Sequence, residues 1–151
     1  MRENLGKRIK IELFEEFLFN MDEMLDHLVN DAARSGLDLD FSLHSLSSLE
    51  EYIFGTMPAM NAPERKQLSV SASRYLGEVV RRCYGGKWML NIDDEKDLNY
   101  GQYVIVGHNA HQLEFNPHSK IKMLLMKRSS GFLKYVVSNQ ISPVEIKIAP
   151  E

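Results

Sequence analysis

The spacing of apolar residues changes once along this chain, at the pair Gly85-Gly86. Before this pair, apolar residues recur every three or four positions, which is the period of a helix that buries one face. After it, residues 87–92 and 102–106 carry the short apolar runs of strands. This order predicts an α+β fold, with N-terminal helices packed on a small antiparallel β-meander and one or two C-terminal helices after it.

Three helices are predicted before the change, over residues 8–34, 43–55 and 63–84. The first is too apolar to stand alone, because three phenylalanines fall within residues 14–19 and need a surface to cover them. The segment 37–41 alternates apolar and acidic residues, which suits an extended connector or an edge strand.

Residues with known preferences mark the ends of these helices. Ser42 is the expected N-cap of the second helix, and Ser47 with Glu50 is a rival capping box one turn later. Pro63 suits the first turn of the third helix, after a loop over 56–63. Glycines follow the three helices, and they favour the backbone that ends a helix. These glycines are Gly36, Gly55 and Gly85.

The second half is predicted to hold three strands and two helices. A polar turn over 93–101 separates the first two strands, and His111–Phe115 is the expected third strand. Asn116-Pro117 begins the next helix as N-cap and first residue, and a shorter helix covers 132–139. The tail 141–151 alternates apolar residues and is either an edge strand or loose. We expect one domain over 1–151, with 1–7 and 143–151 as candidate loose tails.

Composition limits the class of protein. The chain has 151 residues, of which 44% are hydrophobic and 26% charged, as in globular proteins and unlike disordered ones. The net charge of −3 argues against a dedicated nucleic-acid binder. No run approaches 18 apolar residues, so we expect no membrane partner. The charged N-terminus does not suit a signal peptide, which predicts a cytoplasmic location.

The small net charge conceals a strong separation along the chain. Residues 1–10 hold four basic and one acidic residue, whereas 11–60 hold one basic and eleven acidic residues. Residues 61–151 hold thirteen basic and nine acidic residues. Two interpretations remain open. Either the acidic half docks on the basic half of the same chain, or it attracts a basic partner.

One histidine-rich segment is a candidate metal site. His108, His111 and Glu114 form H-x-x-H-x-x-E, and His118 follows. Imidazole and carboxylate are suitable zinc ligands. A three-residue step brings side chains together on a helix, but on the strand predicted here it points them to opposite faces. We therefore expect solvated loop histidines and no metal.

Two further residues could carry chemistry. Cys83, the one cysteine, follows two arginines that would favour its thiolate, but it falls on the apolar stripe of the third helix. We therefore expect it to be buried and inert. Glu78 lies near the buried edge of that helix and is either a general base or the partner of an arginine or of the Trp88 indole. We expect the structural role, with no catalytic residue and no cofactor.

The segment ASRYLGEVVRRCYGGKW, residues 72–88, resembles a helix-to-strand junction with the pattern YLGE, a spacer and GGxW. This junction occurs in bacterial α+β domains of unknown function. Gly77 lets another element approach the helix closely, and Trp88 begins a strand that packs against it. The resemblance implies a particular fold but no catalysed reaction. Some domains of this sort are loosely similar to immunity and antitoxin proteins, which bind toxins.

The sequence therefore favours a non-enzymatic interaction domain, whose partner is another protein such as a toxin. A small enzyme or metal-binding module using His108, His111, Glu114 or Glu78 is the first alternative. A self-associating structural domain is the second, with a homo-oligomer formed through the N-terminal helix.

Overall fold

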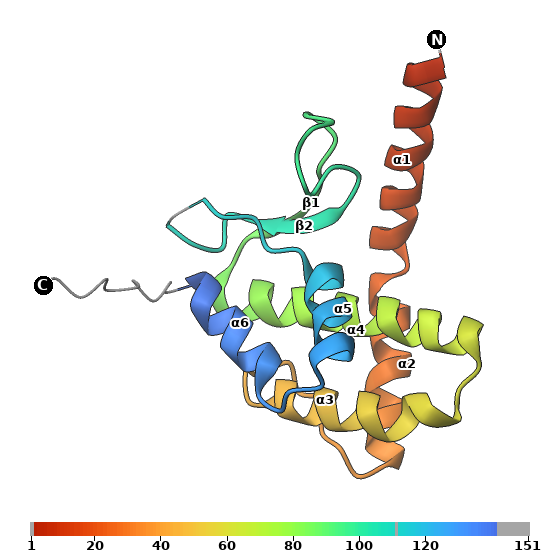
Figure 1. Ribbon diagram of the computed structural model, residues 1–151, viewed down its shortest axis with the longest axis vertical. Coiled ribbons are helices and arrows are strands. Elements are labelled where there is room, and N and C mark those ends of the chain that lie inside the picture. Colours follow the sequence, from red (N-terminus) through yellow and green to blue (C-terminus); the bar gives the residue numbers. More distant parts are fainter. Residues whose placement is uncertain (1, 111, 142–151) are drawn as a thin grey trace, which may run out of the picture.

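The computed structural model describes residues 2–110 and 112–141, which form a group of α-helices with a short β-hairpin lying above them in the view of Figure 1. This arrangement confirms the α+β class. The elements are α1 (Arg2–Phe19), α2 (Met21–Arg34), α3 (Ser45–Thr56), the 3-10 turn η1 (Met57–Ala59), α4 (Ala62–Tyr84), β1 (Lys87–Leu90), β2 (Tyr103–Val106), α5 (Pro117–Lys127) and α6 (Phe132–Ile141). Within the described residues, no helix is both long enough and apolar enough to cross a bilayer.

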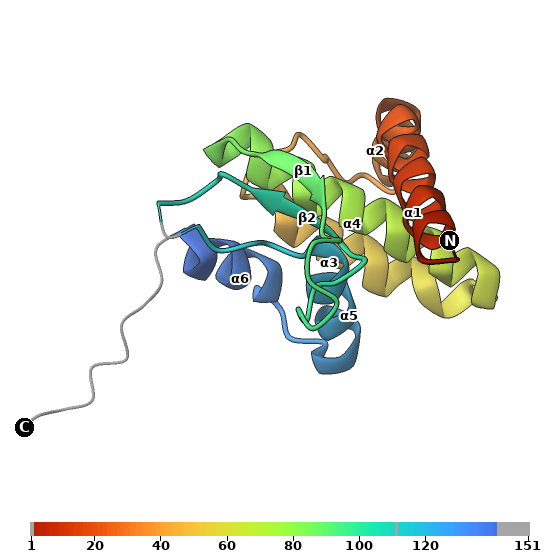
Figure 2. The ribbon, with the colours of Figure 1, turned by 90° about the horizontal axis from the view of Figure 1, so that it is seen from above.

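Helix α4 is the centre of the fold. It contacts α2, α3, α5 and β2, and all residues from 71 to 80 are buried. In Figure 1, α2 passes behind α4, α5 lies in front of it and the hairpin lies above it; Figure 2 gives the same order from above. Asn61 caps α4 by accepting from the Glu64 amide at 2.9 Å, and Gly85 ends it with φ at +88°. The predicted span of this helix is confirmed.

The predicted first helix is longer than expected and is interrupted. It begins at Arg2 rather than at residue 8, and Asn20 separates α1 from α2. The last carbonyls of a helix lack partners within it. The Arg74 guanidinium, from α4, donates to one of them, the Phe17 carbonyl. Arg74 therefore stabilises the end of α1 from a position that is distant in the sequence.

The buried face of α1 and α2 follows one row of side chains four residues apart. Phe17, Met21 and Leu25 are buried in this row, and Leu28 and Ala32 continue the buried face. Beyond Phe17 toward the N-terminus, α1 rises away from the other helices (Figure 1), although the Phe14 ring still contacts Tyr103 of the hairpin, with ring centres 5.1 Å apart. The C-terminal part of the predicted long helix is thus docked, whereas its N-terminal part projects.

Helix α3 begins three residues after the expected N-cap. The Ser42 hydroxyl accepts from the Ser45 amide at 3.1 Å, so Ser42 still caps the turn that precedes the helix. The rival box of Ser47 with Glu50 is not formed. The Glu50 carboxylate instead accepts from the amides of Gly131 and Leu133 at 2.9 and 2.8 Å. A buried acid of α3 therefore holds the N-terminal end of α6.

The sheet has two strands in the described residues, and the predicted third strand is wrong. β1 and β2 pair antiparallel, with Trp88 opposite Ile105. Phe115 makes only an isolated bridge to Ile105. The Asn109 side chain accepts from the Leu113 amide at 3.1 Å, and Gln112 has φ at +56°, so the chain turns where a strand was expected. His111 lies outside the described residues.

The two helices predicted near the end of the chain are both present. Asn116 accepts from the Ser119 amide at 3.1 Å and caps α5, which confirms its predicted role. Helix α6 covers the expected 132–139 and extends to residue 141. The tail 142–151, expected to be an edge strand or loose, lies outside the described residues.

Gly77 allows β1 to approach α4 closely. A Cβ atom built at Gly77 would lie 2.2 Å from the Trp88 ring, whereas contacts below 3.0 Å are essentially never seen. The indole therefore occupies the space that any side chain at this position would need. The sequence-based expectation for Gly77 and Trp88 is confirmed.

We predict that Gly77→Ala lowers the free energy of unfolding by about 1–3 kcal/mol, because the new methyl group displaces the Trp88 ring. The matched control is Gly55→Ala in α3, where nothing lies within 4 Å of the added carbon. This change should raise the free energy by about 0.4–1 kcal/mol. Urea unfolding measures both. Equal effects of the two substitutions would contradict the close packing at Gly77.

Candidate functional site

Glu78 is buried, and two side-chain donors bind one of its carboxylate oxygens. Arg81 Nη1 and Trp88 Nε1 approach the same carboxylate oxygen at 2.7 and 2.9 Å, and Arg82 Nε lies 3.9 Å from the other oxygen. Both kinds of partner expected from the sequence are therefore present. The carboxylate joins α4 to β1, and these contacts give it a structural role.

Cys83 is exposed, so the prediction that it is buried is wrong. The apolar stripe of α4 reaches its position, but the body of the protein no longer covers the last turn of the helix there. The nearest polar contact of the thiol is with the Phe41 carbonyl, at a sulfur–oxygen distance of 3.8 Å. Helical spacing gives the direction of a side chain but not where the covering elements end.

The candidate metal ligands have different hydrogen-bond partners. His108 is buried, so the expectation of a solvated histidine is wrong for this residue, and its Nε2 lies 2.9 Å from the Gln140 amide oxygen. Glu114 accepts from Asn91 and Asn99, each at 3.0 Å. His111 lies outside the described residues. Within residues 2–110 and 112–141, no group of three His, Cys, Asp or Glu side chains is placed to hold a metal ion.

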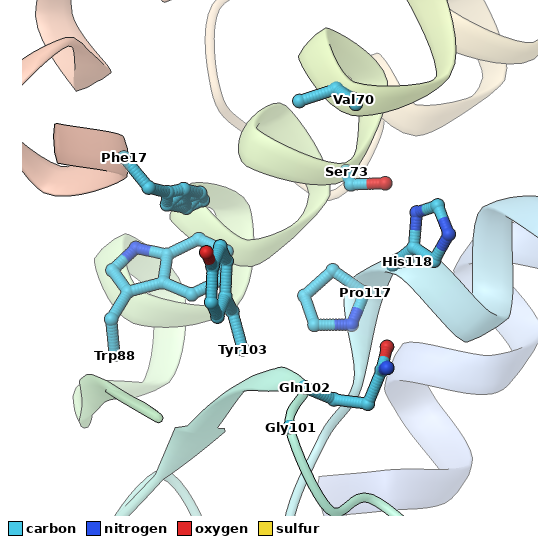
Figure 3. Close-up of a pocket in the computed structure, with 9 residues that line it drawn as sticks. All are labelled: Phe17, Val70, Ser73, Trp88, Gly101, Gln102, Tyr103, Pro117 and His118. Carbon is cyan, nitrogen blue, oxygen red and sulfur yellow. The ribbon is translucent and has the colours of Figure 1, made fainter. Parts of the chain in front are cut away.

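A small apolar pocket lies where α1, α4, the hairpin and α5 meet (Figure 3). Its volume is about 200 Å³. Phe17, Trp88 and Tyr103 form one wall, with ring centres 5.0 and 4.7 Å from Phe17. The facing side holds Val70, Ser73, Pro117 and His118, and Gly101 and Gln102 complete the lining.

The chemistry of this pocket suits an apolar group. Its lining includes no Asp, Glu, Lys, Arg or Cys, so it brings no pair of strong acids and bases together. Burial raises the pKa of the Tyr103 phenol, which keeps it neutral over a wider pH range. The lining residues come from positions 17 to 118. No local sequence pattern could therefore have indicated the pocket.

A larger groove of about 470 Å³ runs between α2, α3 and α4 and is acidic. It contains three carboxylates and no lysine or arginine. The carboxylates belong to Glu23, Asp31 and Glu64; the other lining residues are Asn20, Met24, His27, Leu28, Tyr52, Met60, Gln67, Leu68 and Ser71. The groove was not predicted from the sequence, although its charge agrees with the acidic segment 11–60.

Ion pairs do not join the acidic and basic halves in the described part of the chain. The three that it contains pair Arg34 with Asp31, and Arg81 and Arg82 with Glu78. The buried Arg74 instead contacts the Phe17 carbonyl and lies 4.0 Å above the Phe17 ring centre. The acidic segment 11–60 therefore does pack on the second half of the chain, since α2 and α3 contact α4 and α3 contacts α6, but no described ion pair joins the two halves.

The projecting part of α1 exposes a row of large apolar side chains. Leu5, Ile9 and Leu13 are 56%, 48% and 52% exposed and lie four residues apart on one side of the helix. We call these three residues the α1 row. The row extends toward the N-terminus the series that begins at the buried Phe17. This series is therefore covered near the C-terminal end of α1 and exposed to solvent toward its N-terminal end. This helix was predicted to begin at residue 8, with 1–7 as a candidate tail, so neither the full row nor its exposure was predicted.

Comparisons with protein-family models, with curated proteins and with solved structures give no match to this chain. Function is therefore inferred from the surfaces and side chains described above.

We predict that Glu78→Ala lowers the free energy of unfolding by about 1–3 kcal/mol, because the Trp88 and Arg81 donors lose their shared acceptor. Glu78→Gln keeps one oxygen for the indole and should cost less. Glu51→Gln, at an exposed site of α3, is the control and should change stability by no more than about 0.5 kcal/mol. Urea unfolding followed by the fluorescence of the single tryptophan measures all three. A fully stable Glu78→Ala variant would contradict the structural role.

Proposed function

We propose that this chain is a non-enzymatic protein-interaction domain and that the α1 row is its main binding surface. The observation that carries the proposal is the continuity of the row with the buried face of the same helix. The series Leu5, Ile9 and Leu13 leads directly into Phe17, which is buried. A second protein that covers the row would complete a face that this chain covers only in part.

The energetics of an isolated helix support this proposal. Helical segments shorter than about 12–15 residues are marginal in water. The projecting part of α1 is about this length and carries Gly6, which disfavours helix. Burial of apolar surface contributes about 25 cal/mol per Å². Contact with a partner would therefore stabilise both the helix and the complex.

A finer proposal concerns the charge of the partner. The lining of the groove between α2, α3 and α4 contains Glu23, Asp31 and Glu64 and no lysine or arginine. Arg34 pairs with Asp31 at 3.1 Å, so Glu23 and Glu64 are the lining carboxylates that have no described ion pair. A partner with a basic surface would be attracted to this side of the molecule. An immunity-type or antitoxin-type role, in which the acidic surface covers a basic site on a toxin, fits this charge.

The enzyme alternative has less support. Glu78 is engaged by Arg81 and Trp88, and His108 by Gln140. The pocket beside Phe17 offers His118 and Tyr103 but no carboxylate or amine to act with them. Paired acid and base groups of the kind used in general catalysis are thus not gathered in this pocket.

The test is affinity capture from an extract of the native cell, with the full chain attached to a resin. We expect the natural chain to retain another protein in stoichiometric amount at about 50 mM salt. Ile9→Glu should reduce the retained amount at least about tenfold, because it places a charge in the α1 row. Ile11→Glu is the matched control, since two residues along a helix turn the side chain by about 200°.

The two variants must show the helical content and melting temperature of the natural chain. For a basic partner, raising the salt to about 500 mM should also weaken retention. Absence of any retained protein at low salt, or equal loss with Ile9→Glu and Ile11→Glu, would contradict the proposal. Retention that does not depend on salt would contradict the basic partner alone.

A further inference from the structure

We infer that the pocket beside Phe17 binds a small aromatic carboxylic acid, with the ring of the acid inside the pocket and its carboxylate beside Lys10. The class of ligand follows from the size of the pocket, from the side chains that line it and from the charges around it. The site does not use the α1 row, so the inference does not rest on the proposed function.

The size of the pocket limits the ligand to one or two rings. Its volume of about 200 Å³ lies below the roughly 300–1,000 Å³ of sites that enclose drug-sized molecules. Figure 3 shows the rings of Phe17, Trp88 and Tyr103 on one side and Val70 on the facing side. Val70 is 36% exposed, so solvent reaches this side of the pocket. A small ligand can therefore enter without unfolding of the chain.

The three rings of the wall favour an aromatic ligand over an aliphatic one. The Trp88 and Tyr103 rings are inclined to the Phe17 ring by 74° and 49°. The wall therefore offers both ring faces, which carry partial negative charge, and ring edges, which carry partial positive charge. A planar aromatic ligand can make stacked and edge-to-face contacts with such a wall, in addition to the burial of its apolar surface.

A lysine at the edge of the pocket lacks an acidic partner. Gly101 lines the pocket, and the Lys10 Cε atom lies 3.9 Å from a Cβ built at Gly101. The Lys10 ammonium group is one bond further along the side chain. Lys10 forms no ion pair within the described residues, and no residue that lines the pocket is acidic. A ligand carboxylate would therefore give this ammonium group a charged hydrogen-bond partner.

A buried arginine behind the same wall adds positive charge. Arg74 is 6% exposed, lies 4.0 Å above the Phe17 ring centre and pairs with no carboxylate in the described part of the chain. Burial has the largest effect on the pKa of the Tyr103 phenol. Of the two charges that act on this pKa, Arg74 lowers it more than Glu16 raises it. The charges at this wall therefore favour an anionic ligand over a cationic one.

A titration of the full chain with three phenyl compounds tests the class of ligand. Phenylacetate is the acid, phenylacetamide has nearly the same shape without the charge, and phenethylamine is the cation. Trp88 is the single tryptophan and lines the pocket, so its fluorescence reports binding. At about 20 mM salt, we expect phenylacetate to bind with a dissociation constant of about 0.1–2 mM. It should bind at least about threefold tighter than the amide and at least about tenfold tighter than the amine.

Two pairs of variants test the position of the ligand. Lys10→Gln should weaken phenylacetate at least about threefold and leave phenylacetamide within about 1.5-fold, because it removes the charge and keeps the pocket. Arg8→Gln is the matched control, since two residues along a helix turn the side chain by about 200°. Val70→Phe should weaken both compounds at least about fivefold by filling the pocket. Gln67→Phe, at an exposed site of α4 outside the lining, should not.

The variants must keep the helical content and melting temperature of the natural chain. The pair at positions 8 and 10 lies on α1 and tests the inference even if a phenylalanine destabilises α4. The inference is overturned if Trp88 fluorescence shows no saturable change up to about 20 mM phenylacetate. Equal affinities for the acid and the amide, or equal losses within either pair of variants, would overturn it as well.

A last compound separates a free acid from the end of another protein chain. N-acetylphenylalanine carries the same phenyl ring and carboxylate on a peptide unit, as a C-terminal phenylalanine does. We expect it to bind no tighter than phenylacetate, because the small pocket holds the ring alone. Binding at least about tenfold tighter would show that the site takes a chain terminus, and it would overturn the assignment to a small free acid.

Discussion

The packing of Trp88 on Gly77 is the contact on which the rest of the structure depends. The missing side chain at Gly77 admits the indole ring, and Glu78 accepts its N–H at 2.9 Å. Trp88 in turn contacts the Phe17 ring edge to face, and Arg74 from the same central helix holds the Phe17 carbonyl. One group of contacts thus fixes α4, the hairpin and α1 relative to one another, and it determines where α1 leaves the body.

Local chemistry explains why much of this fold could be predicted. Pro63, Gly85 and Asn116 act on backbone within a few residues of themselves, so the limits of α4 and the start of α5 followed from the sequence. Glu78 and Trp88 are separated by ten residues and one turn, which made their contact predictable as well. Helical spacing also indicated the part of the first helix that is buried, from Phe17 to Ala32.

Contacts between distant residues explain what could not be predicted. Helix α1 ends where Arg74, 57 residues away in the sequence, donates a hydrogen bond to the Phe17 carbonyl. Glu50 accepts hydrogen bonds from amides at the start of α6 and does not cap its own helix. Asn109 accepts from the Leu113 amide, which stabilises a turn where the third strand was expected. Cys83 lies beyond the elements that cover the rest of its stripe. The pocket and the exposure of the α1 row likewise depend on how the elements assemble.

The central claim is that no other described part of this chain covers the α1 row. Native-state hydrogen exchange tests this claim most directly. Amides of residues 71–80 in α4 should exchange only through global unfolding, because they are buried on every side. In a dilute sample, amides of residues 5–13 should exchange at least about a hundredfold faster than these. Protection of residues 5–13 equal to that of α4 would contradict the claim.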